Sequence, residues 1–182
     1  MSRKYRIHNQ REVYFVTFTT VQWIDVFTRD EYKEIFVESV KYCQQHKGLE
    51  VYAWVIMTNH IHMIIGTTGS KLQDLIRDLK SFTSQHIRLA IENSTAESRK
   101  GWLLWMFGKA GVYNRNNIDW QMWQQHNHPI ALDTDEKTMQ RLNYLHENPV
   151  RAGFVTEATH WKWSSAYDYD GGKGLIDIIF IN

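Results

Sequence analysis

The hydrophobic positions of this chain follow two different periods, and the changes between them divide it into short strands and longer helices. Residues 12–20 (EVYFVTFTT) are rich in β-branched and aromatic side chains, which predicts a first strand. Residues 50–57 and 60–66 form two further apolar runs, separated only by Thr58 and Asn59. So short a link predicts that these two runs pair as a β-hairpin.

Two helices are predicted where apolar residues recur every three or four positions. The first follows Thr28 and ends before Gly48, and Thr28 with Glu31 has the spacing of a capping box. The second runs from Lys71 to about Glu92. Both are expected to bury one face and to leave the other to solvent.

The C-terminal half has a less regular pattern. After a polar loop, residues 101–134 mix Trp, Tyr, Gln, Asn and Arg, which suits irregular packing as well as stacking on unpaired bases. A last helix is predicted to begin near residues 133–135. It ends at Glu147 or Asn148, because Pro149 disfavours a helical residue just before it. A turn, aromatic packing and a final apolar segment are expected after this helix.

Composition favours a single folded domain. At 182 residues with 43% hydrophobic content, the chain can bury a substantial core, so one domain over residues 1–182 is expected. The net charge is only +1, so any basic surface that meets nucleic acid must be local. The aromatic share of 14%, with eight Trp, exceeds what a small core requires and leaves rings for ligand contact.

Cysteine usage and the lack of long apolar runs bear on the compartment. The single cysteine, Cys43, has no partner for an internal disulfide, which fits a reducing environment. Neither a charged-then-apolar leader nor an apolar run of roughly 18 residues is present, which argues against export and membrane insertion. We therefore expect a cytoplasmic protein.

The segment VYAWVIMTNHIHMIIG carries the first candidate chemistry. His60 and His62 lie two apart within a predicted strand, so both imidazoles point to one face. Two imidazole nitrogens at a fixed spacing form half of a divalent-metal site, because imidazole suits several divalent ions. Such a pair also occurs as a purely structural feature, so a metal site needs further ligands.

The last predicted helix offers residues that could complete such a site. Tyr144 and Asn148 are four positions apart and share one helix face, with roughly 6 Å of axial rise between them. An Asn148 oxygen could supply a third ligand and leave other metal positions for phosphate oxygens. A tyrosine hydroxyl, with a reference pKa of about 10, is a poor nucleophile near neutral pH and needs a Lewis acid on the phosphate that it attacks.

A basic stripe follows the second predicted helix. Arg77, Lys80, Ser84 and Arg88 fall at spacings of three or four residues, so they line up on one face that can meet phosphates. An ordinary solvated helix face would have the same pattern, so the stripe alone does not decide between the two.

Other polar residues near these segments have open roles. His126 and His128 lie in an extended segment that contacts DNA or is structural, with a second metal site as the alternative. His146 is two residues from Tyr144 and therefore points to another helix face. Glu147 is a candidate base or an outer-shell acceptor for the metal site.

Several motifs of the chain resemble those of the single-tyrosine HUH transposases, and especially their REP-associated tyrosine transposase branch. The resemblance spans most of the chain and is carried by YFVTFTT, AWVIMTNHIHMII, RDLKSFTS, YLHENPVRAGFV and WSSAYDY. NHIHMII and YLHENPVRAG are its most specific segments.

This resemblance implies a fold, an activity and a set of site residues. The fold would be α+β, a ferredoxin-like (RRM-like) antiparallel sheet with helices packed on it. The activity would be cleavage and rejoining of single-stranded DNA, usually near a hairpin, with Mg²⁺ or Mn²⁺. His60 and His62 would be the paired metal ligands and Tyr144 the nucleophile that becomes linked to a 5′ phosphate. Asn148 would be the third ligand, at a position where family members use different polar residues.

Single-stranded DNA also suits residues outside this site, because unpaired bases stack on aromatic side chains. The candidates for DNA contact are Arg77, Lys80, Arg88, Arg115, Trp120 and Trp123. Transposases of this class are often dimers, whereas the REP-associated branch need not be, so a homodimer stays open.

Two other functions compete with this one. In a metal-dependent phosphodiesterase, metal-bound water rather than Tyr144 would attack the phosphate. In a non-catalytic nucleic-acid-binding module, binding would survive loss of both histidines and no covalent adduct would form. The intact set of His60, His62, Tyr144 and Asn148 favours the transposase.

Overall fold

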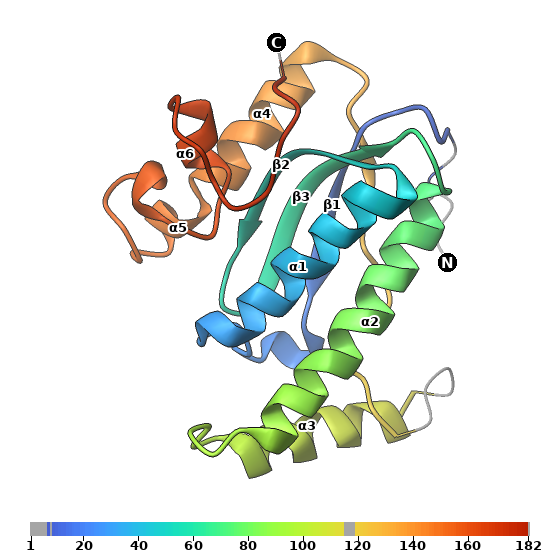
Figure 1. The fold of residues 1–182 in the computed structure, drawn as a ribbon, viewed down its shortest axis with the longest axis vertical. Coiled ribbons are helices and arrows are strands. Elements are labelled where there is room, and N and C mark those ends of the chain that lie inside the picture. Colours follow the sequence, from blue (N-terminus) through green and yellow to red (C-terminus); the bar gives the residue numbers. More distant parts are fainter. Residues whose placement is uncertain (1–6, 8, 115–118, 182) are drawn as a thin grey trace.

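The computed structural model describes residues 7, 9–114 and 119–181 (Figure 1). Its strands are β1 (Tyr14–Thr19), β2 (Leu49–Ile56), β3 (His60–Thr67) and β4 (Ile130–Ala131). Its longer helices are α1 (Asp30–Lys47), α2 (Leu72–Asn93), α3 (Lys100–Val112) and α4 (Asp135–His146). The short helical segments are α5 (Asn148–Arg151), α6 (Ala166–Tyr169) and the 3-10 turns η2 (Val21–Trp23) and η3 (Ala158–His160).

The sheet has the strand order β2-β3-β1-β4, and all neighbouring strands are antiparallel. Along the chain the elements follow as β1-α1-β2-β3-α2, and β4 completes the second edge of the sheet. This is the split βαβ arrangement of ferredoxin-like folds, so the predicted α+β fold is confirmed. α1 and α2 lie side by side on one face of the sheet, and α4 packs on the other (Figure 1).

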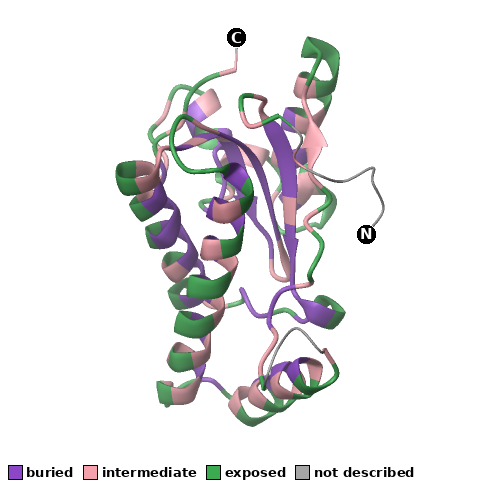
Figure 2. Ribbon diagram, turned by 90° about the vertical axis from the view of Figure 1, so that its right-hand side faces the viewer, coloured by how far each residue is buried: buried purple, intermediate pink, exposed green. Residues whose placement is uncertain are grey.

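The alternation of side chains along β1 decides what each face of the sheet carries. Tyr14, Val16 and Phe18 point into the main core beneath α1 and α2. Phe15 points the other way, into a smaller core that includes Leu145 of α4. Figure 2 shows the resulting layers, with the sheet buried and the outer sides of the helices exposed.

The start of α1 differs from its prediction. The helix begins at Asp30 with Arg29 as its N-cap, and no side chain caps it there. The predicted capping box of Thr28 and Glu31 is wrong, because the Thr28 hydroxyl accepts a hydrogen bond from Arg99 at 2.8 Å instead. The Thr28 hydroxyl, which the local sequence predicts as a helix cap, thus makes a tertiary contact with Arg99 instead.

α3 is a helix that the sequence pattern does not predict. Its residues are apolar almost all round, so no stripe with a helical period stands out. Leu103 and Phe107 are buried, and a side chain at Gly111 would collide with the backbone of Asp119 and Trp120, which explains the glycine. α3 has 13 residues, and none of the described helices is long and apolar enough to cross a membrane.

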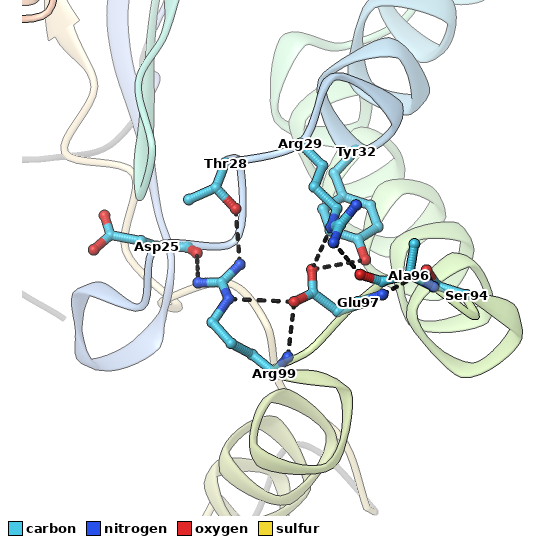
Figure 3. A network of polar contacts seen from close by, with 8 residues as sticks. All are labelled: Asp25, Thr28, Arg29, Tyr32, Ser94, Ala96, Glu97 and Arg99. Atoms are coloured by element: carbon cyan, nitrogen blue, oxygen red, sulfur yellow. Dashed lines mark hydrogen bonds and ion pairs between the residues drawn. The ribbon is translucent and has the colours of Figure 1, made fainter.

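A buried carboxylate joins the segment between α2 and α3 to the start of α1 (Figure 3). Glu97 is 6% exposed and accepts hydrogen bonds from Arg29, Tyr32 and Arg99. Burial alone would raise the pKa of Glu97, but the hydrogen bonds and charges of Arg99 and Arg29 outweigh it and lower the pKa. Arg99 also donates to the carbonyl of Asp25 at 2.7 Å. A charged Glu97 therefore holds the loop before α1 in place.

We expect Glu97→Gln to lower the free energy of unfolding by about 3 kcal/mol, because it removes a buried charge that accepts several charge-assisted hydrogen bonds. Glu34→Gln, at an exposed position of α1, is the matched control and should change it by less than about 0.5 kcal/mol. Urea unfolding followed by circular dichroism measures both. Equal effects would show that the network adds nothing beyond a surface charge.

Candidate active site

His60 and His62 lie on β3, on the face of the sheet that α4 covers. Ile61 and Met63 alternate with them and point into the main core on the opposite face. The two imidazole rings are 4.8 Å apart between centroids and inclined at 67°. His62 is buried, at 6% exposure, whereas His60 is half-buried. The strand thus brings both imidazoles to one face, as their spacing predicts.

Both imidazoles use Nδ1 for a hydrogen bond within the protein. Nδ1 of His62 lies 2.9 Å from the Thr17 hydroxyl, and Nδ1 of His60 lies 2.7 Å from Oδ1 of Asn59. Asn59 is itself oriented, because its amide nitrogen donates to Asp25 at 3.0 Å. Since a carboxamide oxygen only accepts, Nδ1 of His60 carries the proton and Nε2 keeps a lone pair that can bind a metal.

Nε2 of His62 is a buried nitrogen to which no hydrogen-bond partner is assigned in the described part of the chain. Burial, followed by the charges of His60 and Arg141, lowers the pKa of His62 to about 3, so this ring is neutral near pH 7. Burial also lowers the pKa of His60. Metal binding requires neutral imidazoles, and a metal would satisfy a buried nitrogen that is otherwise unpaired. The pair therefore fits a divalent metal ion.

Tyr144 projects from α4 toward His62. The centroids of the two rings are 5.4 Å apart, and the ring planes are inclined at 61°. The Tyr144 ring also meets the edge of Phe15 from β1 at 6.2 Å. Leu145, the next residue, is fully buried and anchors α4 on the sheet. This packing sets Tyr144 beside the histidine pair, with part of its side chain open to solvent.

Asn148 lies four residues after Tyr144, although a break separates their helices. α4 ends at His146, Glu147 keeps helical backbone angles, and Asn148 opens α5. The Asn148 amide nitrogen donates to the Tyr144 carbonyl at 3.4 Å. The same side chain acts on His60 as a hydrogen-bond partner that favours a higher pKa. Asn148 thus contacts His60 and the Tyr144 backbone, and its side-chain oxygen, the atom that can accept from an imidazole, faces His60.

Within the part of the chain that the structure describes, the histidine pair has no third ligand of the kinds that most often hold a metal. Among the described residues, no group of three His, Cys, Asp or Glu side chains is placed to hold one ion. The role of Asn148 as the third ligand stays a prediction, and a carboxamide oxygen is a chemically suitable ligand for it. The same finding covers His126 and His128, whose exposed rings are 6.1 Å apart, so the alternative of a second metal site gains no support.

Two arginines that the sequence analysis missed flank the site. The guanidinium carbon of Arg151 lies 5.5 Å from the centre of the Tyr144 ring, and that of Arg141 lies 5.4 Å from the centre of the Phe15 ring. The charge of Arg141 also reaches His62, where it helps to lower the pKa. The signal for Arg141 is its position three residues before Tyr144 on one helix face. Both guanidinium groups bring positive charge close to the aromatic rings beside the histidine pair, where an anionic group would be attracted.

The neighbours of Tyr144 in sequence have other surroundings. His146 is half-buried, its Nε2 lies 2.9 Å from the Ser165 hydroxyl, and burial lowers its pKa to about 4. The prediction that His146 points to another helix face is therefore confirmed. Glu147 is exposed at the junction of α4 and α5, and its role as a base or acceptor stays a prediction.

The predicted DNA-contacting residues gather at a groove between α2 and residues 119–127. The groove has a volume of about 990 Å³. Its lining includes Arg77, Lys80, Arg88, Trp120 and Trp123. Residues 119–127 follow the edge of β1, where the Thr17 amide donates to the Asn127 carbonyl at 3.1 Å. Thr17 thus contacts both the wall of the groove and His62.

Arginine and tryptophan side chains form the open wall of this groove. Arg77 is exposed and pairs with acidic residues of α2 itself. The guanidinium carbon of Arg88 lies 5.1 Å from the centre of the Trp120 ring, and Arg88 pairs with Glu92. Trp120 is half-buried and donates to the Ser84 hydroxyl at 3.0 Å. The C-terminal part of the stripe, Ser84 and Arg88, therefore faces an aromatic partner rather than open solvent alone.

Two of the predicted contact residues turn inward. Nζ of Lys80 donates to the Gln124 carbonyl at 2.6 Å, and burial lowers the pKa of Lys80 to about 7. Trp123 is 6% exposed in the main core, where its Nε1 donates to the Thr83 hydroxyl at 3.0 Å. The prediction that Trp123 stacks on a base is corrected here, because a buried ring presents no face to a base. Arg115 lies outside the described residues.

The fold and the site together define a ferredoxin-like protein in which a His-x-His strand faces a helix that carries a tyrosine. Residues 11–108, more than half of the chain, match the family described as "Transposase IS200 like". The chain belongs to this family. The match includes both histidines and ends before Tyr144. None of the curated proteins matches the chain.

Two solved structures are similar to this chain. One is that of a REP-associated tyrosine transposase bound to a REP hairpin, with a TM-score of 0.66 and 16% identity, covering 100% of this chain and 94% of that one. The other is that of a candidate transposase from Deinococcus radiodurans R1, with a TM-score of 0.45 and 15% identity, covering 78% of this chain and 94% of that one. The resemblance drawn from the motifs is confirmed in the family and, through the first structure, in the fold.

Proposed function

We propose that this IS200-like transposase cleaves and rejoins single-stranded DNA through a covalent link between Tyr144 and a 5′ phosphate. The observation that carries the proposal is the contact of Tyr144 with His62, whose buried Nε2 has no partner assigned within the described residues. A side chain of the nucleophilic type and a metal-binding nitrogen thus face one site.

Mg²⁺ or Mn²⁺ is the cofactor that we propose for this site. His60 and His62 would hold the ion through Nε2, and the Asn148 oxygen would be the third ligand. When bound, the ion would neutralise charge on the scissile phosphate. A set with two nitrogens suits Mn²⁺ better than Mg²⁺, which prefers oxygen ligands, so we expect Mn²⁺ to bind more tightly.

Cleavage would be an in-line displacement at phosphorus. The Tyr144 oxygen forms a bond to phosphorus while the bond from phosphorus to the 3′ oxygen breaks. The tyrosine hydroxyl loses its proton, and the 3′ oxygen gains one to become a hydroxyl. Arg141 and Arg151 would stabilise the charge on the phosphate. Because the phosphotyrosine keeps the phosphodiester energy, a 3′ hydroxyl can attack it later and rejoin the strand.

DNA with a hairpin is the substrate class that we propose. The similar transposase of known structure is bound to a REP hairpin. In the present chain, the groove beside α2 offers Arg77 and Arg88 to phosphates and Trp120 to a base. Since Thr17 contacts both the groove wall and His62, a duplex held at the groove could pass its single strand over the sheet to Tyr144.

The test is incubation with Mn²⁺ and a pool of hairpin oligonucleotides labelled at either end, resolved under denaturing conditions. We expect protein-linked label from the 3′-labelled strands only, because Tyr144 keeps the 5′ phosphate of the downstream fragment. The 5′-labelled strands should give a shortened free product that ends in a 3′ hydroxyl. Cleavage without an adduct would identify a phosphodiesterase. Binding without cleavage, unchanged when both histidines are replaced by alanine, would identify a binding module.

The groove makes a separate prediction about hairpin affinity. We expect Arg77→Gln with Arg88→Gln to weaken binding about tenfold or more and to reduce the slope of log K against log salt by about 2, roughly one for each lost phosphate contact. The control is Lys41→Gln with Lys173→Gln, which removes the same charge from α1 and from the C-terminal segment. Fluorescence anisotropy across a salt series measures both. Equal losses would mean that only overall charge matters.

A further inference from the structure

Trp23 is an exposed tryptophan beside the histidine pair, and the proposed cleavage step does not use it. It is 58% exposed, and its ring meets the His60 ring edge-on with centroids 5.8 Å apart. Its neighbours Val21 and Ile24 are buried. The turn is thus anchored on both sides of Trp23, and it presents the indole to solvent next to the site.

The backbone that presents Trp23 is unfavourable for the residues it contains. Gln22 and Trp23 have φ angles of 53° and 56°, in the left-handed region that residues with a Cβ avoid. Tertiary hydrogen bonds hold the turn, since the Thr20 hydroxyl donates to the carbonyl of Asn59, directly before His60, at 2.9 Å. Backbone strain that is maintained in this way clusters at functional sites.

Trp23 and Tyr144 contact different members of the histidine pair. Tyr144 lies against His62, and Trp23 lies against His60. In an in-line displacement the leaving oxygen departs opposite to the attacking one. With Tyr144 as the attacking group, the leaving 3′ oxygen and its nucleoside would therefore lie toward His60 and Trp23.

We infer that Trp23 stacks on the base of the nucleotide immediately 5′ of the scissile phosphate, the nucleotide that carries the 3′ hydroxyl after cleavage. This inference rests on the proposed function. Every base has a face that can stack on an indole, so Trp23 positions the strand without selecting its sequence. Stacking also holds the 3′ hydroxyl near the phosphotyrosine, which favours rejoining over loss of the fragment.

The test combines variants of Trp23 with oligonucleotides that carry one abasic site, placed in turn at each position around the cleavage site that the wild type defines. We expect Trp23→Ala to lower kcat/KM about 5- to 100-fold and Trp23→Phe to recover most of the loss. The abasic site just 5′ of the cleaved bond should cost the wild type the same factor and cost Trp23→Ala nothing. Tyr42→Ala is the matched control, because Tyr42 is 55% exposed beside His46 on α1, on the other face of the sheet.

The outcomes separate this inference from the proposed function. Wild-type protein that forms the adduct while Trp23→Ala matches it would overturn the stacking role alone. An abasic penalty of equal size in wild type and Trp23→Ala would do the same, because the base and the ring would then act independently. If the wild type forms no adduct, the proposed function fails, and an abasic site moved along the whole hairpin oligonucleotide and read by binding affinity still decides whether one base couples to Trp23. Thermal unfolding checks that each variant is folded.

Discussion

Tyr144→Phe is expected to abolish the covalent protein–DNA adduct and to lower strand cleavage by about 10³-fold or more, because it removes the only atom that forms the new bond to phosphorus. The ring itself remains, so its contacts with His62, Phe15 and Arg151 should persist. Hairpin affinity and the unfolding midpoint should therefore stay close to those of the wild type. Labelled adducts separated under denaturing conditions and anisotropy measurements on the same variant give the two results side by side.

The matched control for this change is Tyr167→Phe, which removes a hydroxyl from an exposed tyrosine of α6. It should leave adduct formation unchanged. Cleavage that continues at the wild-type rate in Tyr144→Phe would assign the attack to water instead. An adduct that persists in Tyr144→Phe would place the nucleophile on another residue.

The strands that carry the site could be predicted because their patterns are local. Alternation along residues 12–20 and 60–66 predicts which side chains share a face, and the sheet keeps that alternation in both strands. His60 and His62 therefore lie together as expected. What the pattern does not contain is the register between strands, which places Thr17 opposite His62. The hydrogen bond that orients His62 could only be found once β1 and β3 were known to pair.

The groove illustrates the opposite case, in which composition suggests a role but not a location. The spacing of the basic residues predicts the stripe on α2, which forms one wall of the groove. The other wall is formed by residues 119–127, whose sequence has no regular period. Trp120 and Trp123 look alike in sequence and both line the groove, yet the ring of Trp123 is buried in the main core whereas Trp120 is only half-buried. The difference arises from tertiary packing, because Trp123 meets Phe18 at 5.9 Å beneath α1 and α2.

The break between α4 and α5 is a further feature of the site that the sequence predicts only in part. Pro149 correctly indicates that the tyrosine helix ends nearby. The backbone of Glu147 nevertheless stays helical, so Asn148 remains within reach of the Tyr144 carbonyl. The predicted neighbourhood of Tyr144 and Asn148 therefore survives, although they no longer share one continuous helix.

His62→Ala is expected to lower metal-dependent cleavage by about 10³-fold or more, because His62 supplies one of the two imidazoles proposed to hold the ion.

Thr17→Val tests the orientation of Nε2 of His62 without removing the imidazole ring. The Thr17 hydroxyl lies 2.9 Å from Nδ1 of His62, so it fixes the ring orientation that aims Nε2 into the site. We expect this isosteric change to weaken Mn²⁺ binding about 10- to 100-fold and to leave activity recoverable at high Mn²⁺.

Thr19→Val is the matched control for Thr17→Val, because Thr19 lies on the same strand, two positions on, in register with His60. Mn²⁺ titrations followed by electron paramagnetic resonance would give the affinity of each variant without relying on cleavage. Mn²⁺ binding that survives His62→Ala would place the ion elsewhere. Similar affinities for Thr17→Val and Thr19→Val would mean that packing in β3, rather than the Thr17 hydroxyl, orients His62. A selective loss in Thr17→Val would instead link the metal site to β1, the strand whose Thr17 amide also binds the wall of the groove.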